Sequence, residues 1–148
     1  MCYYLNEIEE AVSCYNKGFS CSQAIFSAHS KKFGVSYELA LKIASAFGGG
    51  MARLGDVCGA VTGAFMVIGL KYGRSTIEDE NARETTYSLV RTFVEKFTKK
   101  NGSIKCKELL KYDLNVPEQR EIAKKKNLFK TLCPLFVRNS AEILNEIL

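Results

Sequence analysis

The chain has 148 residues, of which 47% are hydrophobic and 25% are charged, and it contains no tryptophan and only two prolines. These values are typical of a globular protein with a packed core and exclude a disordered chain, and the length predicts a single domain over residues 1–148. The formal net charge is +5, and lysines occur in small groups at residues 31–32, 99–100 and 124–126. No aromatic residues alternate with these lysines, so we expect a solvated surface and no nucleic-acid partner.

The N-terminus carries no basic segment followed by an apolar stretch, so no signal peptide is predicted. The longest apolar run, residues 60–70, is too short to span a bilayer and contains Thr62, Gly63 and Gly69. We therefore expect a cytoplasmic protein with no membrane insertion.

Helical periodicity dominates the first third of the chain. A first helix is predicted to end at residues 16–18, and a second opens at Ser20, which has the spacing of a capping box with Gln23 and is followed by a stop at Gly34. Ser36 is the expected cap of a third helix. The predicted inward-facing residues are Leu5, Ile8, Val12 and Tyr15 in the first helix, Ala24, Ile25, Ala28 and Phe33 in the second, and Leu39, Leu41, Ile43, Ala44 and Phe47 in the third.

Residues 48–56 interrupt this pattern, and Asp56 is the expected N-cap of a helix that runs to Tyr72. Thr76 is predicted to start a long helix ending at residues 101–102, and Ser103 to cap a short helix. Further helices are expected to start at Pro117 and at residues 133–134. Inward-facing residues are predicted to be Ala82, Thr86, Leu89 or Val90, Phe93, Val94 and Phe97 in the long helix, and Val137, Ala141, Leu144 and Leu148 in the last. Without strands or repeats, the pattern predicts an all-α, compact bundle of about six to eight helices.

Six cysteines stand out in this helical chain: Cys2, Cys14, Cys21, Cys58, Cys106 and Cys133. A chain without an export signal is expected to keep its thiols reduced, so these residues are interpreted as metal ligands, redox thiols or small core residues. No two of them form a local C-x-x-C motif. Any site that they share must therefore be assembled by the fold.

Four of the cysteines, Cys21, Cys58, Cys106 and Cys133, fall in or beside the first turn of a predicted helix. The N-terminal end of a helix has unpaired N–H groups and partial positive charge, which favour the thiolate form. Four thiolates gathered at one point would suit a metal ion or an iron–sulfur cluster. The alternative is that each cysteine is a small buried apolar residue. The separations match neither a zinc finger nor a ferredoxin motif.

Gly59 and Gly63 lie four residues apart and therefore share one face of a predicted helix. A face without side chains allows close approach of a cofactor, or of another helix within the chain or across a homodimer. The run Gly48–Gly50 is not a phosphate-binding loop, because no Gly-Lys-Ser/Thr sequence follows it.

The segments around these cysteines resemble the C_GCAxxG_C_C family of redox-active proteins. The resemblance rests on "SCSQAI", "FGGGMARLGDVCGAVTGAFMVIGLKYG", "GSIKCKELL" and "CPLFVRNSAEIL", and it covers the chain from about Ala11 to the end. It maps the four characteristic cysteines onto Cys21, Cys58, Cys106 and Cys133, and it implies a helical fold and a redox function. Related domains occur beside haem modules in split-Soret-type cytochromes, which favours an iron–sulfur centre. The absence of C-x-x-C-H excludes covalent c-type haem here.

Four functional hypotheses follow. In the first, the four cysteines bind an iron–sulfur cluster for electron transfer with a redox partner protein, and Gly59 and Gly63 contact the cluster. In the second, two of the cysteines form a thiol–disulfide enzyme, with Cys58 as the attacking thiolate and no metal. The third is a structural zinc site, and the fourth is a helical interaction module with buried cysteines. Cys2 and Cys14 are extras with no family role; Cys14 is expected in the core, with substitution as a ligand as the alternative. His29 is expected to be a surface or half-buried residue. Arg53 is expected to be a surface arginine, with pairing to an anionic cluster or an acidic partner as the alternative.

Overall fold

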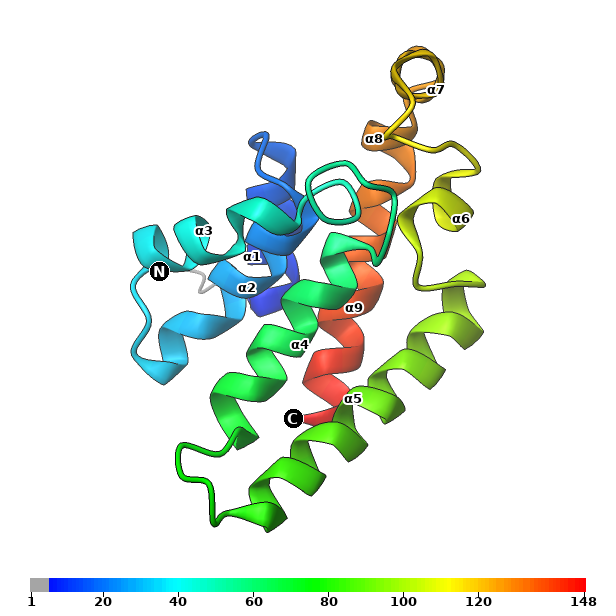
Figure 1. Cartoon of the computed structure of the whole chain (residues 1–148). Helices are drawn as coiled ribbons and strands as arrows, with labels where there is room; N and C mark the ends of the chain where they lie inside the picture. The colour runs from blue at the N-terminus through cyan, green and yellow to red at the C-terminus, as the bar shows by residue number, and fades with distance from the viewer. Residues whose placement is uncertain (1–5) are drawn as a thin grey trace.

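The computed structural model describes residues 6–148, so the predictions for Cys2 and Leu5 lie outside the described residues. The first part of the chain forms three α-helices and two 3₁₀ turns (Figure 1). Their bounds are α1 Glu7–Asn16, α2 Cys21–Ser30, η1 Lys31–Phe33, α3 Tyr37–Ala44 and η2 Ser45–Phe47. The remainder forms α4 Gly59–Tyr72, α5 Glu80–Asn101, α6 Cys106–Leu110, α7 Pro117–Lys125, α8 Leu128–Thr131 and α9 Cys133–Ile147. The all-α prediction is therefore confirmed.

Helices α2, α4 and α9 form the centre of the molecule, and α2 and α4 make the most extensive helix pair. Helices α1 and α3 flank α2 on one side, whereas α5 lies against α4 and α9 on the other (Figure 1). The centre of α4 is apolar on every side, as expected for a helix surrounded by others. The side chains that are fully enclosed between these helices include Ile25, Val61, Phe93, Phe97, Val137 and Leu144.

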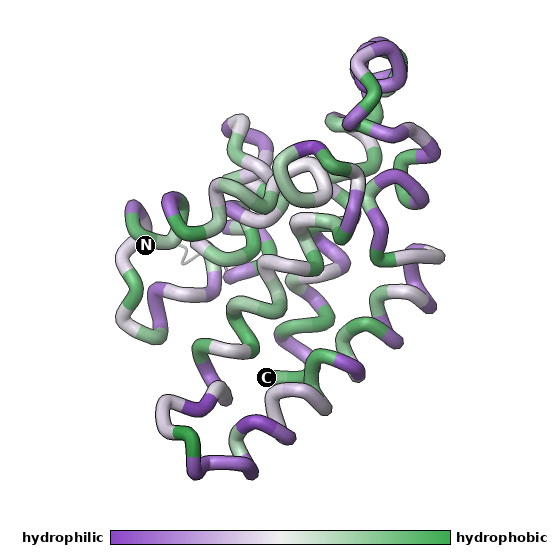
Figure 2. Tube along the Cα trace, in the orientation of Figure 1, coloured by the Kyte–Doolittle hydropathy of each residue, from purple (hydrophilic) through white to green (hydrophobic). Residues whose placement is uncertain are grey.

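The polar helix α7 lies at one end of this bundle. It is drawn largely in hydrophilic colours, in contrast to α4 (Figure 2). Helix α7 buries only Ala123. It therefore contributes little to the central core, although it closes one side of the cavity described below.

The helix caps confirm several sequence predictions. Ser20 and Gln23 form a complete capping box, with the Ser20 N–H donating to Gln23 Oε1 at 3.0 Å. The Ser36 hydroxyl accepts a hydrogen bond from the Leu39 N–H at 3.2 Å. Gly34 adopts a left-handed conformation after η1, with φ of 82°. These local signals fix where α2 and α3 begin and where η1 ends.

Three predicted helix starts are wrong by a few residues. Helix α4 begins after Cys58 rather than after Asp56, and α5 begins after Asp79, whose carboxylate accepts from the Ala82 N–H, rather than at Thr76. The N-cap of α6 is Lys105, and Ser103 instead accepts a hydrogen bond from the Lys105 N–H. The single turn α8 was not predicted, since it follows the left-handed residue Asn127 without a side-chain cap.

Three predicted inward faces need correction. In α3, Leu39 and Ile43 are exposed, at 50% and 46% of their surfaces, while Ala40 and Ala44 are buried. Small residues are needed on this face because α3 packs closely against α2. In α1 the buried residues are Ala11 and Cys14, whereas the predicted residues Ile8, Val12 and Tyr15 are only partly buried. In α5 only Phe93 and Phe97 of the longer predicted stripe are buried.

The described residues contain no β-sheet, and their one β-bridge pairs Val57 with Lys105. In the same part of the chain, no helix combines the length and the apolar character that crossing a membrane requires.

Candidate functional site

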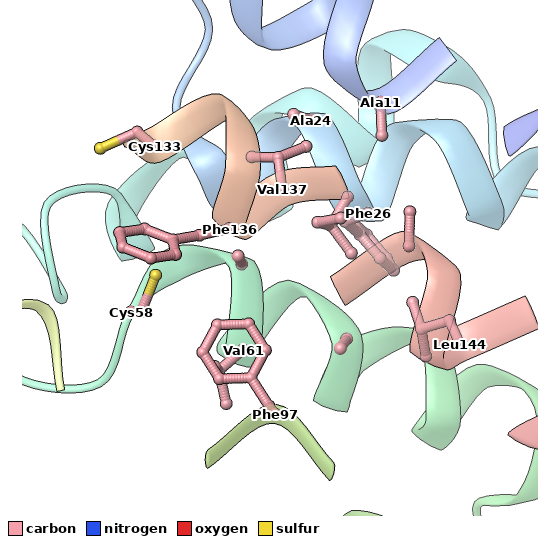
Figure 3. Packing of buried hydrophobic residues seen from close by; sticks show 14 of the residues in the cluster. Ala11, Ala24, Phe26, Cys58, Val61, Phe97, Cys133, Phe136, Val137 and Leu144 are labelled. Carbon is pink, nitrogen blue, oxygen red and sulfur yellow. The ribbon is translucent and has the colours of Figure 1, made fainter. Parts of the chain in front are cut away.

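Four cysteines, from four different helix starts, line one cavity of about 890 Å³. Cys21, Cys106 and Cys133 are the first residues of α2, α6 and α9, and Cys58 is the N-cap of α4. Cys58, Cys106 and Cys133 are buried, and Cys21 is half-buried. Figure 3 shows Cys58 and Cys133 at the same end of the core, near the ring of Phe136. The fold therefore assembles the cysteines that the helix-start argument selected.

Glycine contacts hold the start of α2 against α4. A Cβ added at Gly59 would lie 2.8 Å from the backbone nitrogen of Ser22 and 3.2 Å from the Cβ of Cys21. One turn later, a Cβ at Gly63 would lie 3.0 Å from the Ser22 carbonyl oxygen and 3.0 Å from the Cβ of Ile25. The glycine face of α4 is thus packed against α2 of the same chain, and this contact brings Cys21 close to Cys58. Gly59 also lines the cavity.

A short extended pairing joins the starts of α6 and α4. The Cys58 N–H donates to the Ile104 carbonyl at 2.8 Å, and the Cys106 N–H donates to the Asp56 carbonyl at 2.7 Å. Asp56 therefore acts through its backbone in this pairing and not as the predicted helix cap. The two hydrogen bonds place Cys58 and Cys106 on neighbouring segments of the chain, although these segments are far apart in sequence.

Helix α9 is fixed to α4 by one buried polar contact. The Ser140 hydroxyl donates to the Ala60 carbonyl at 2.7 Å, and both residues are fully enclosed. Ala60 is in the first turn of α4, where its carbonyl is two residues from Cys58. Because every cysteine-bearing helix is connected to the start of α4, this helix is the centre on which the site is built.

The loop from Gly49 to Arg53 is left-handed throughout, with φ between 50° and 69° at five consecutive residues. Met51, Ala52 and Arg53 are not glycines, and this conformation costs on the order of 1–2 kcal/mol for each such residue. No residue other than glycine fits at position 50, since a Cβ there would lie 2.6 Å from the Cβ of Cys106. The turn closes the cavity beside α6 and fixes the position of Cys106.

Interactions among the thiols decide their proton affinity. Interaction with Cys133 and then with Cys58, together with burial, raises the pKa of Cys21 well above the usual thiol value. Burial, with the charges of neighbouring thiols, raises the pKa of Cys106 to about 12. For these two residues, enclosure and neighbouring sulfurs outweigh the effect of a helix N-terminus, so the predicted ease of deprotonation does not hold for Cys21 and Cys106.

Cys133 differs from Cys21 and Cys106, because its pKa is lowered. Interaction with Cys21 is the main cause, and an interaction with the Tyr15 hydroxyl acts in the same direction. The Tyr15 hydroxyl also donates to the Phe129 carbonyl at 2.7 Å, which holds its ring at the edge of the cavity. Burial, and then the charges of Cys21 and Cys133, raise the pKa of Tyr15. Tyr15 therefore keeps its proton, which it donates in a hydrogen bond to the Phe129 carbonyl, and its hydroxyl lies beside Cys133, whose thiolate it favours.

Sequence reasoning placed Tyr15 in the core and did not assign it to the site. Its helical spacing within α1 gives no signal of the contact with Cys133, which depends on the packing of α1 against α9. The polar helix α7 also contributes Arg120, Glu121 and Lys124 to the cavity lining, a contribution that the sequence did not predict.

The remaining predicted residues lie elsewhere or have other contacts. Cys14 is buried outside the cavity lining, with its sulfur 3.6 Å from the Ser27 hydroxyl and 3.6 Å from the Tyr37 hydroxyl. His29 is fully buried, not at the surface, and its Nδ1 hydrogen-bonds the Ile25 carbonyl at 2.9 Å. Arg53 is exposed but also lines the cavity.

Among residues 6–148, no group of three or more His, Cys, Asp or Glu side chains has the arrangement needed to hold a metal ion. The four cysteines share the lining of the cavity, and the direct thiol interactions connect Cys21 with Cys133 and Cys58. Their role as ligands, and the role of Gly59 and Gly63 as cofactor contacts, stay predictions at this point.

Comparison with known proteins agrees with this arrangement. No curated protein and no solved structure matches the chain. One family model, described as "Putative redox-active protein (C_GCAxxG_C_C)", matches residues 19–147. The match includes all four cysteines of the cavity and most of the chain. The chain therefore belongs to the C_GCAxxG_C_C family of redox-active proteins.

Proposed function

We propose that Cys21, Cys58, Cys106 and Cys133 bind an iron–sulfur cluster, most simply a two-iron cluster, for electron transfer to or from a partner protein in the cytoplasm. The observation that carries the proposal is the shared cavity, into which four helix starts each bring one cysteine. Four cysteine thiolates are the usual ligand set of such clusters. A bound cluster would supply reversible electron uptake at a potential set by its ligands, hydrogen bonds and burial.

The protein residues would act on the ligands and on solvent. The helix starts of α2, α4 and α9 carry partial positive charge, which stabilises a set of thiolates once their protons have been displaced. The Tyr15 hydroxyl would favour the thiolate form of Cys133. Gly59 lets α4 approach α2 and lines the cavity, so its backbone is the part of α4 proposed to contact the cofactor. Gly63 would support the site by the same packing.

Single cysteine-to-serine variants test the ligand assignment. Each of C21S, C58S, C106S and C133S should lower the iron and sulfide content and the visible absorption of protein reconstituted without oxygen. The matched control is C14S, because Cys14 is buried like Cys58, Cys106 and Cys133 but lies outside the cavity lining. If all four site variants kept the colour and iron content of C14S, the proposal would be wrong.

A thiol–disulfide mechanism is the second candidate, and the direct interaction between Cys21 and Cys133 favours it. The lowered pKa of Cys133 makes this thiol the better nucleophile, where the sequence had predicted Cys58. In this mechanism metal-free protein would form one reversible disulfide by exchange with a disulfide substrate, which would be reduced to two thiols. Cys133 would be alkylated first near neutral pH. Peptide mapping of partly alkylated protein would identify the cysteine that reacts first.

A further inference from the structure

The segment with α6, α7 and α8, which adjoins the cavity, carries most of the net positive charge of the chain. Residues 105–130, which contain α6, α7 and most of α8, have eight basic and four acidic residues, a net charge of +4 where the whole chain has +5. The hydrophilic colouring of α7 in Figure 2 marks this segment. Charge concentrated beside one cavity attracts oppositely charged molecules to it.

This positive charge is not neutralised within the described residues. Ion pairs there join α1 to η1 and to α9, α5 to α9, and neighbours within α3 and around the start of α5. None of the basic residues at positions 105–130 forms a salt bridge with a carboxylate in this part of the chain. The contact of Lys126 is with the hydroxyl of Tyr112, at 2.6 Å.

Three cations line the cavity itself: Arg53, Arg120 and Lys124, against one carboxylate, that of Glu121. The side chain of Arg53 lies against its own loop: its Cγ is 3.0 Å from the position that a Cβ at Gly49 would take. Arg120 is half-buried, and within the described residues its guanidinium forms one hydrogen bond, in which Nη1 donates to the Leu114 carbonyl at 3.4 Å. Removing a guanidinium from water without a counter-charge is unfavourable, so an anion beside Arg120 would be stabilised.

The cavity also has room beyond the thiols. Its volume of about 890 Å³ is within the usual range of small-molecule sites, roughly 300–1,000 Å³. Phe19, Phe129 and Phe136 contribute apolar wall between the basic side chains and the cysteines. Small-molecule sites combine such walls with a few polar groups that fix orientation.

We propose that Arg53, Arg120 and Lys124 form an anion subsite, which holds a small organic carboxylate or phosphate ester in the cavity next to the cysteines. The inference deepens the proposed function, on which it rests for the redox meaning of the site. Binding of the anion itself requires only the cavity, and so it can be measured in protein without a cluster.

Alkylation with two reagents of nearly equal size tests the subsite. Iodoacetate is an anion and iodoacetamide is neutral, and both transfer a two-carbon group to a thiolate with loss of iodide. We measure the ratio of the two rates at the cavity cysteines of metal-free, reduced protein at low salt, with peptide mapping. The reference is the same ratio for the same cysteines in urea-unfolded protein. The folded protein should favour iodoacetate by about tenfold over this reference, because basic clefts concentrate anions.

Variants locate the effect. R53M/K124M removes two exposed cations that line the cavity, and R120M removes the half-buried one, so each should bring the ratio closer to the unfolded reference. The matched control is R91M/K99M, which removes two exposed, unpaired cations on α5 outside the cavity lining. This control should keep the ratio of the wild type. Added inorganic phosphate should slow iodoacetate more than iodoacetamide in the wild type and in R91M/K99M, and this difference should be smaller in R53M/K124M and R120M.

Three results would overturn the inference: equal ratios in folded and unfolded protein, no effect of R53M/K124M and R120M, or an equal effect of R91M/K99M, which would indicate net charge instead of a subsite. If the protein prefers iodoacetate but takes up no cluster, the anion subsite is supported and the proposed function is contradicted. If it takes up a cluster but does not prefer iodoacetate, the proposed function is supported and the anion subsite is contradicted.

Discussion

Replacement of Gly59 by alanine should destabilise the protein through one added methyl group. The new Cβ would lie 2.8 Å from the backbone nitrogen of Ser22, 3.2 Å from the Cβ of Cys21 and 3.3 Å from the Phe47 carbonyl oxygen. A distance below 3.0 Å to a backbone atom requires a helix to move, since no rotamer change relieves it. The start of α2, with Cys21, must therefore shift away from α4.

The magnitude follows from two opposing effects. Overpacking in a core costs about 1–3 kcal/mol. Alanine recovers at most about 0.5–1 kcal/mol of the backbone entropy that glycine loses in a helix. We therefore expect G59A to lower the free energy of unfolding by about 1–2 kcal/mol. For a protein of this size, each kcal/mol lowers Tm by about 2–4 °C.

Urea denaturation of reduced, metal-free protein, followed by far-ultraviolet circular dichroism, measures this difference. Gly69 provides the matched control, because it lies in the same helix and a Cβ there would meet nothing within 4 Å. G69A should raise the free energy of unfolding by about 0.5–1 kcal/mol. In reconstituted protein, G59A should also bind less iron than G69A. Equal stabilities of G59A and G69A would refute the close approach of α2 and α4.

Three other predictions concern caps, thiols and pH. S20A removes the capping-box hydroxyl at the start of α2 and should cost about 1 kcal/mol in urea denaturation, so an unchanged midpoint would contradict the cap. Y15F removes a hydroxyl that favours the Cys133 thiolate, so the alkylation rate of Cys133 in metal-free protein should rise at a higher pH than in the wild type; superimposable pH profiles would exclude that contact. Burial lowers the pKa of His29 below its ordinary value of 6.5, and the unfolded chain therefore binds a proton that the folded protein does not. The free energy of unfolding should accordingly fall as the pH decreases from about 6.5 to 5, and H29Q, compared at the same pH values, should show a smaller fall.

Local signals in the sequence were sufficient for much of the fold. Caps at Ser20 and Ser36 and the stop at Gly34 depend on side chains and backbone conformations within a few residues, and these predictions are confirmed. The four cysteines at helix starts follow from the same local signals, even where the helix bounds were wrong. A displacement of two or three residues still leaves each cysteine in the first turn or at the cap.

The sequence predictions were wrong where contacts with a distant segment of the chain determine the local structure. Asp56 has the side chain of an N-cap, but its carbonyl is used in the pairing with Cys106, which no local pattern reveals. In α3, Leu39 with Ile43 and Ala40 with Ala44 have the same spacing, so periodicity alone cannot choose the buried pair. The close approach of α2 selects the alanines.

The sequence also did not predict the left-handed turn at residues 49–53. Glycines at positions 49 and 50 permit it, but Met51, Ala52 and Arg53 ordinarily avoid this conformation. Hydrogen bonds hold the turn from both sides, including those from Arg53 N–H to the Gly48 carbonyl and from the Asp56 N–H to the Gly50 carbonyl. Strained backbone of this kind is found at functional sites, which agrees with its position beside Cys106.

The most direct test of the account is the visible absorption spectrum, with iron, sulfide and zinc analysis, of protein purified and handled without oxygen. The proposal predicts a brown protein that contains iron and acid-labile sulfide, and whose colour bleaches on reduction. A zinc-containing, colourless protein that unfolds on chelation would identify a structural zinc site instead. A colourless, metal-free protein that takes up no cluster on reconstitution would contradict the central claim and favour the Cys21–Cys133 thiol pair.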